Sequence, residues 1–168
     1  MANIEASQFT GDNNWALLLG LDGFITEGTG DNFFIIKDGV VITPEGRDIL
    51  RGISREYVMS ELCPTLGIPV IEKNIEPYDV YTADEAFITG TPFCMLPVTS
   101  LNGLKVGNGK VGDLFSKIIR LWSKKLDLNI ISQIQQWDSE RSKEHSNDAP
   151  TPYNFGKKSK VAKYPKRI

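Results

Sequence analysis

The chain has 168 residues, of which 40% are hydrophobic and 24% charged, and its net charge at pH 7 is −2. These values are typical of one globular domain with a buried core, and they exclude collagen-like, fully disordered and disulfide-scaffold classes. Two cysteines and one histidine do not complete a zinc site, so no metal site is expected. No apolar run approaches the roughly 18 residues of a membrane span, and the N-terminus lacks the regions of a signal peptide. The cytoplasm is the predicted location.

The N-terminal part of the chain predicts strands joined by glycine-rich turns. Trp15–Leu21 is a short apolar run, which is typical of a strand buried on both faces. Asn32–Lys37 and Val40–Thr43 are rich in aromatic and β-branched residues, and Asp38-Gly39 separates them. An Asp-Gly pair between two such runs predicts a β-hairpin.

The middle of the chain predicts a helix and two short elements. Ile53–Leu62 has apolar residues at helical spacing, with Ser54 in the expected N-cap position. Pro69–Ile75 is predicted to be a short strand, and Pro77–Tyr81 one helical turn.

The C-terminal half adds two predicted strands and the longest predicted helix. The strands are Glu85–Thr89, which runs into Gly90-Thr91-Pro92, and Leu96–Leu101. The helix spans Asp113 to about Lys125, and the segment from there to Trp137 is compatible with helix or loop. Because no regular alternation of strand and helix is present, the pattern predicts an α+β fold with a barrel-like mixed sheet and flanking helices.

Charge and composition change near residue 138. Residues 139–168 carry a net charge of +5 and the rest of the chain −7, and the last twelve residues contain six basic groups and no acid. We therefore predict a domain over 1–138 and a polar, basic, disordered tail over 139–168. A basic tail can also contact nucleic acid, but the acidic body shows no interleaving of aromatic and basic residues, so nucleic acid is not the expected partner.

Two segments have the residue types of a phosphate site, and a third holds an isolated acid. Gly52-Ile53-Ser54 stands at a predicted helix start, where N–H groups and a hydroxyl can bind an anion; an ordinary N-cap is the alternative. Gly90-Thr91 follows a predicted buried strand and offers a second hydroxyl, with a simple turn as the alternative. Glu27 lies in a glycine-rich stretch between strands, either as a solvated loop acid or as the partner of a buried cation.

Four ordered segments carry a resemblance to a known family. They are GFITEGTGDNFFI (23–35), Thr43-Pro44, LRGISR (50–55) and ADEAFITGT (83–91). In this order they resemble the C-terminal domain of fold-type IV aminotransferases, the family of the branched-chain and D-amino-acid aminotransferases. The resemblance covers about residues 3–137, and its motifs are specific for the family and much less so for the substrate.

The resemblance implies a pyridoxal 5′-phosphate site. In the family, a glutamate in the segment E-G-x-G-x-N pairs with the pyridinium nitrogen of the cofactor, and Glu27 matches it. Leu50 matches the leucine that packs on the ring. Ile53 and Ser54 match the phosphate-binding turn, and Thr91 matches a second phosphate contact.

The sequence departs from the family pattern in two ways, which argue against assigning it as a complete branched-chain enzyme. Pro92 and Phe93 follow Thr91, where branched-chain enzymes usually have an alanine whose N–H holds the substrate carboxylate, and then a second small residue. The family's Schiff-base lysine, a phosphate-binding arginine and a small N-terminal domain would all precede Asn3. We therefore expect an N-terminally truncated chain that is inactive alone, with no catalytic residue of its own.

The function predicted from these observations is the cofactor-binding part of a transaminase acting on amino acids and 2-oxo acids, homodimeric in the complete protein. One alternative is a non-catalytic module that binds a ligand or a partner chain. The other is a pyridoxal phosphate enzyme resembling aminodeoxychorismate lyase.

Overall fold

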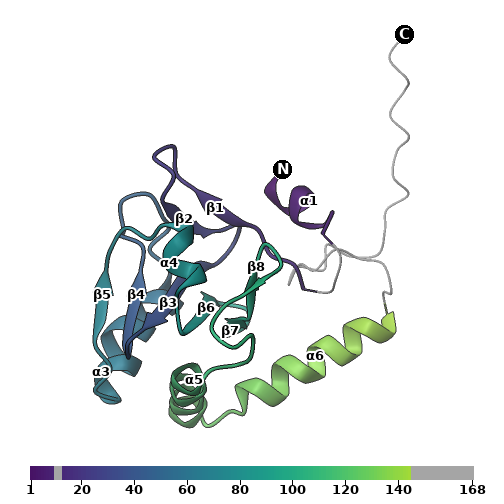
Figure 1. The fold of residues 1–168 in the computed structure, drawn as a ribbon. Helices are drawn as coiled ribbons and strands as arrows, with labels where there is room; N and C mark the ends of the chain where they lie inside the picture. The colour runs from purple at the N-terminus through teal and green to yellow at the C-terminus, as the bar shows by residue number, and fades with distance from the viewer. Residues whose placement is uncertain (10–12, 145–168) are drawn as a thin grey trace.

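The computed structural model describes residues 1–9 and 13–144, the last four of these by their backbone alone. Its elements follow the chain in the order shown in Figure 1. The helices are α1 (Ala2–Ala6), α2 (Ile53–Tyr57), the π-helical segment η1 (Val58–Leu62), α3 (Cys63–Thr65), α4 (Pro77–Tyr81), α5 (Asp113–Leu126) and α6 (Ile130–Glu144). The strands are β1 (Leu17–Leu19), β2 (Ile25–Gly28), β3 (Asn32–Lys37), β4 (Val40–Thr43), β5 (Val70–Glu72), β6 (Glu85–Gly90), β7 (Cys94–Val98), β8 (Ser100–Leu101) and β9 (Leu104–Lys105).

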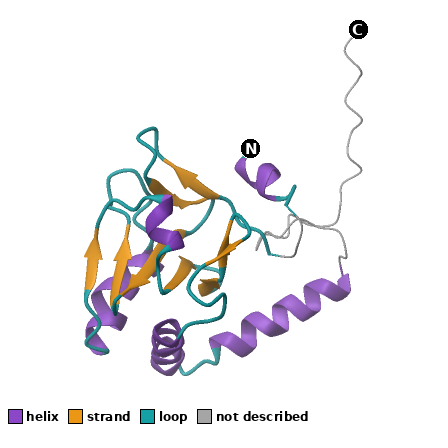
Figure 2. Ribbon diagram, in the orientation of Figure 1, coloured by secondary structure: helices purple, strands orange, loops and turns teal. Residues whose placement is uncertain are grey.

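A curved seven-stranded sheet forms the body of the molecule. β1 to β4 pair antiparallel in chain order, β5 pairs parallel with β4, and β6 pairs antiparallel with both β3 and β7. The strand β3 is therefore bonded to β2, β4 and β6 within the sheet. Helices lie against this sheet and α6 extends away from it (Figure 2). The sequence-based α+β class with a barrel-like mixed sheet is confirmed.

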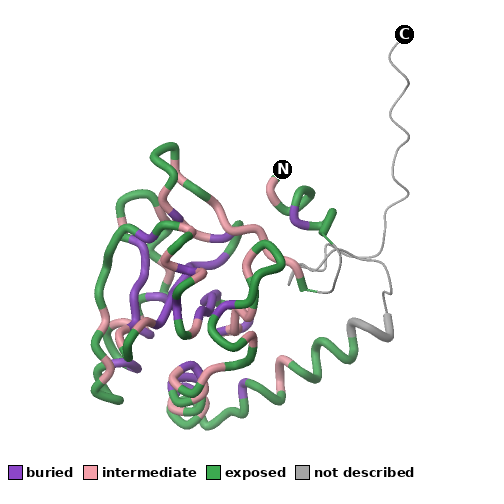
Figure 3. Tube along the Cα trace, viewed as in Figure 1, coloured by how far each residue is buried: buried purple, intermediate pink, exposed green. Residues whose placement is uncertain are grey.

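Alternation along β3 and β6 divides the core into two layers. Phe34, Ile36 and Phe87 point to the face covered by α2, η1 and α5. Phe33, Ile35 and Ile88 point to the opposite face, which packs against β1 and α4. The tube in Figure 3 shows buried residues concentrated in the central strands, with α6 mostly exposed. Side chains at one end of the first face form the candidate site.

Several elements confirm the sequence-based predictions. The hairpin at Asp38-Gly39 forms, and both residues have positive φ (49° and 78°), as its two-residue turn requires. The strands β3, β4 and β6 and the helices α4 and α5 lie where they were predicted. The segment after α5, which was compatible with helix or loop, is the helix α6.

Other predictions were wrong in detail. β1 is shorter than Trp15–Leu21 and is not buried on both faces, because it is an edge strand with Leu19 exposed. The residue that caps α2 is Gly52, so Ser54 lies inside the helix. The helical segment also continues past Leu62 to Thr65, because Pro64 falls in the first turn of α3, where its missing N–H is tolerated. The strand predicted over Leu96–Leu101 is divided between β7 and β8.

The boundary predicted at residue 138 falls inside a helix. α6 continues to Glu144, six residues into the segment predicted to be a tail. The twelve-residue basic end (157–168) lies outside the described residues. Within the part of the chain that the structure describes, no helix has the length and apolar character needed to cross a membrane.

Candidate functional site

A β-bulge in β2 gives Glu27 its direction. Leu17 pairs with Gly28 and Leu19 with Ile25, so three steps along β2 face two steps along β1. An extra residue of this kind reverses which face the following side chains point to. Glu27 therefore points away from the layer that contains Ile25, toward Asn32, its partner on β3.

Asn32 fixes the carboxylate of Glu27 against the loop that precedes α2. Its Nδ2 donates to Oε2 of Glu27 at 3.1 Å and to the carbonyl of Leu50 at 2.8 Å. The backbone N–H of Leu50 donates to the same Oε2 at 2.9 Å. The β2–β3 hairpin and the loop before α2 thus meet at one carboxylate. Burial raises the pKa of Glu27, and the hydrogen bond from Leu50 opposes part of that rise.

The start of α2 lies directly beside this network. A Cβ added to Gly52 would come within 2.3 Å of Oδ1 of Asn32, so only glycine fits there. Gly52 accepts the first intrahelical hydrogen bond, from Glu56, which leaves the first N–H groups of the helix without intrahelical partners. Ser54 is buried, whereas Leu50 and Ile53 are 76% and 84% exposed. The site therefore combines a helix start whose free N–H groups could bind an anion with exposed apolar side chains.

Thr91 lies apart from the other predicted site residues in its contacts. It is exposed, in the turn that joins β6 to β7. Within the described ranges, no hydrogen bond links it to Glu27 or Ser54, although β6 itself packs against α2. Phe93, two residues after Thr91, turns its ring into the core beside Gly90 and makes an edge contact with Trp15, with the ring centroids 5.4 Å apart.

Asp31 is a second acid at the site that sequence reasoning did not single out. It is 7% exposed, and its carboxylate occupies the position that a side chain on Gly28 would take, at 2.2 Å from the added Cβ. Its Oδ2 has no hydrogen-bond partner among the described residues. Burial is the main cause that raises the pKa of Asp31 to about 6, with a smaller contribution from the charge of Glu27, while the N–H of Gly30 acts in the opposite direction.

The structure thus brings Glu27, Leu50, Ile53 and Ser54 into one region and places Thr91 at the end of the neighbouring strand. Asn32 was visible in the sequence only as the last residue of the motif E-G-x-G-x-N. A polar residue that begins a strand of buried apolar side chains was the signal that could have identified it.

Comparison with known proteins agrees with this geometry. The model of the family described as amino-transferase class IV matches residues 1–101. The chain belongs to this family.

Proteins similar to this class IV chain include several branched-chain-amino-acid aminotransferases. That of Pseudomonas aeruginosa is 40% identical over 109 residues, which are 65% of this chain and 35% of the relative. The corresponding enzyme of Escherichia coli K12 is 39% identical over 103 residues, 61% of this chain and 33% of the relative. The chain thus spans about a third of the length of these curated relatives.

Solved structures give the same result. A branched-chain amino acid aminotransferase solved with pyridoxamine 5′-phosphate aligns with a TM-score of 0.66 and 33% identity, covering 70% of this chain and 38% of that one. The Escherichia coli branched-chain enzyme aligns with a TM-score of 0.65 and 36% identity, covering 70% and 39%. That of the archaeon Thermoproteus uzoniensis, solved with norvaline, aligns with a TM-score of 0.63 and 38% identity, covering 70% and 38%.

Proposed function

We propose that this chain forms the pyridoxal 5′-phosphate-binding part of an aminotransferase that acts on amino acids and 2-oxo acids. The observation that carries the proposal is the carboxylate of Glu27. It is held by Asn32 and the N–H of Leu50 beside the first N–H groups of α2, in a class IV chain. An acid and an anion-binding helix start are the two recognition elements that a phosphorylated pyridine needs.

The residues present fit this cofactor. Both hydrogen bonds that the described residues give Glu27 go to Oε2, which leaves Oε1 to accept from a protonated ring nitrogen. The N–H groups of Ile53 and Ser54, together with the Ser54 hydroxyl, suit a phosphate. Leu50 offers an exposed apolar side chain to a ring. Thr91 completes the proposed set from the end of β6.

The residues of this chain would bind the cofactor and adjust the electron demand of its ring. They would not transfer protons at the substrate. When bound, the cofactor supplies an electron-withdrawing ring that stabilises negative charge on the substrate carbon. Glu27 holds a proton on the ring nitrogen, and burial strengthens this interaction because it lowers the local dielectric. Asn32 and Leu50 keep Glu27 in place.

Replacement of Glu27 by Gln is expected to weaken binding of pyridoxal 5′-phosphate by about 10- to 100-fold, the value of one charge-assisted hydrogen bond. Fluorescence titration of the full chain measures the dissociation constant. Glu45→Gln, at an exposed acid outside the proposed set, is the matched control and should change it less than about twofold, within the ordinary range of surface substitutions. Equal affinity of the wild-type chain and Glu27→Gln would contradict the proposed role.

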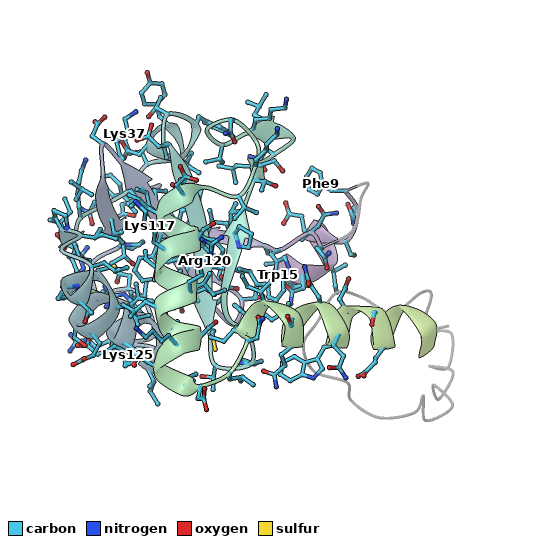
Figure 4. The ribbon with its side chains drawn as sticks, turned by 90° about the horizontal axis from the view of Figure 1, so that it is seen from below. Phe9, Trp15, Lys37, Lys117, Arg120 and Lys125 are labelled. Carbon is cyan, nitrogen blue, oxygen red and sulfur yellow. The ribbon has the colours of Figure 1, made fainter. Side chains whose placement is uncertain are left out.

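Among the lysines whose side chains the structure describes, the following positions do not favour a covalent bond to the cofactor. Lys37 donates to the carbonyl of Thr82 at 2.6 Å and ends the strand that Asn32 begins, about 17 Å away at 3.3 Å per residue. Figure 4 shows Lys37 at one end of the sheet and Lys117 and Lys125 along α5. The exposed side chains of Lys73, Lys105 and Lys110 resemble ordinary surface lysines.

Borohydride reduction of the chain mixed with pyridoxal 5′-phosphate is therefore expected to leave no stoichiometric adduct by intact mass. We infer that the lysine required for turnover is supplied by a segment other than the described part of this chain. A single adduct on one lysine of this chain would overturn that inference and would call for an activity assay of the chain alone.

Substrate and assembly are further parts of the proposal. Pro92 has no N–H, and the N–H of Phe93 already donates to the carbonyl of Gly90 at 3.2 Å. This turn therefore offers one N–H group fewer to a substrate carboxylate than an alanine would, which is a departure from the branched-chain pattern. We also propose a homodimeric complete protein in the cytoplasm, and exposed apolar side chains such as Leu21 support a subunit contact.

A further inference from the structure

We propose that Thr89 is a positioning residue of this site, whose hydroxyl holds the amide of Asn32 in the orientation that fixes Glu27. This inference rests on the proposed function, in which Glu27 binds the ring nitrogen of the cofactor. It assigns a role to a side chain that lies outside the proposed set of cofactor contacts.

The strand register places Thr89 beside Asn32. Glu27 pairs with Asn32 across β2 and β3, and Asn32 pairs with Thr89 across β3 and β6. Residues directly opposite in antiparallel strands share a face, with their Cβ atoms about 4.5–5.5 Å apart. The three side chains therefore form one polar row across three neighbouring strands.

The hydrogen bonds of Asn32 determine which way its amide points. Its Nδ2 faces two acceptors, Oε2 of Glu27 and the carbonyl of Leu50. The Oδ1 must then point the other way, and it lies next to Gly52. No donor to this oxygen is present among the residues that the structure describes, so the amide is held on one side only.

Thr89 supplies the missing donor. It is 1% exposed, and its Oγ1 has no partner in the described part of the chain, which is costly for a buried hydroxyl. Rotation about its Cα–Cβ bond can turn the hydroxyl toward Oδ1 of the opposite Asn32, which satisfies both groups. Thr43 shows the ordinary alternative, since its buried hydroxyl donates to the carbonyl of Phe33 at 2.9 Å.

Three variants of the full chain test this role, because only the loss of the Thr89 hydroxyl should change the affinity for the cofactor. Thr89→Val keeps the shape and removes the hydroxyl, so it should weaken binding of pyridoxal 5′-phosphate by about 3- to 10-fold and also lower the unfolding midpoint of the unloaded chain. Thr89→Ser keeps the hydroxyl and removes a methyl group, so it should keep the affinity and lower the midpoint. Thr43→Val should lower the midpoint and keep the affinity.

A second measurement does not depend on the cofactor. In the ¹⁵N-labelled, unloaded chain, Thr89→Val should shift the side-chain amide resonances of Asn32 and speed their exchange with water, whereas Thr43→Val should not. Unchanged Asn32 resonances, or equal affinity of Thr89→Val and wild type, would overturn the role of Thr89. If the wild-type chain binds no pyridoxal 5′-phosphate, the proposed function fails instead, and the Asn32 resonances alone decide the role of Thr89.

Discussion

Replacement of Asp31 by Asn should stabilise the chain by up to about 3 kcal/mol at pH 8, since a difference of about two pKa units corresponds to that free energy. The reason is that burial raises the pKa of Asp31 from 3.8 to about 6 in the folded state. The folded chain therefore binds a proton more tightly than the unfolded chain. Above pH 6 Asp31 is ionised in the folded chain, which costs stability because the charge is buried. The neutral amide of Asn avoids this cost.

The pH dependence separates this explanation from a general packing effect. Between pH 4 and 6 the contribution of Asp31 to the stability of the wild type should fall as pH rises, so the advantage of Asp31→Asn should grow over the same interval. Urea unfolding of both proteins at several pH values in phosphate-free buffer measures this difference. Asp38→Asn is the control, because Asp38 is exposed and its positive φ of 49° suits Asn equally well. A constant difference between wild type and Asp31→Asn at every pH would refute the assignment.

Replacement of Gly52 by Ala should lower the free energy of unfolding by about 2–4 kcal/mol, which is the cost of two broken buried hydrogen bonds. The added methyl group would lie 2.3 Å from Oδ1 of Asn32. Asn32 must then leave the position from which it donates to Glu27 and Leu50. We also expect binding of pyridoxal 5′-phosphate to weaken by more than about tenfold, because Glu27 loses its orientation.

Urea unfolding and cofactor titration test both effects, with Gly30→Ala as the control. A Cβ on Gly30 meets no atom within 4 Å, so this substitution reports the general effect of an added methyl group in the same region. In the Asn32→Ala background the further loss from Gly52→Ala should be less than about 1 kcal/mol, since the side chain that it displaces is gone. Full additivity of the two substitutions would show that the cost arises elsewhere.

Local patterns explain why part of the fold could be predicted from the sequence. The Asp38-Gly39 hairpin and α5 have signals within a few residues, and both formed as expected. The strand β2 was not predicted, because it pairs with β1 through an irregular register that no simple alternation reveals. The N-cap was assigned to Ser54 instead of Gly52, because glycine at that position is required by Asn32, twenty residues earlier in the chain.

The candidate site was also predictable only where its signals are local. Residue types indicated an acid and two phosphate-binding turns, and the order of the motifs indicated that they belong to one cofactor site. Contacts between distant segments were not visible, so the roles of Asn32 and Asp31 emerged only from the structure. Asp31 in particular follows Gly30 in a polar loop sequence, yet its side chain is buried because Gly28 leaves space for it.

The extra residue in β2 lies between Ile25 and Gly28, and it affects how sequences of this segment should be aligned. Between Gly20 and Gly28, substitutions that keep the number of residues would leave the carboxylate of Glu27 beneath Leu50. Removal of Thr26 would restore a regular ladder with β1, in which Glu27 directly follows Ile25 and, by strand alternation, still points to the opposite face. An alignment of this segment can therefore place a one-residue gap between Ile25 and Glu27 without implying that the acid has changed faces.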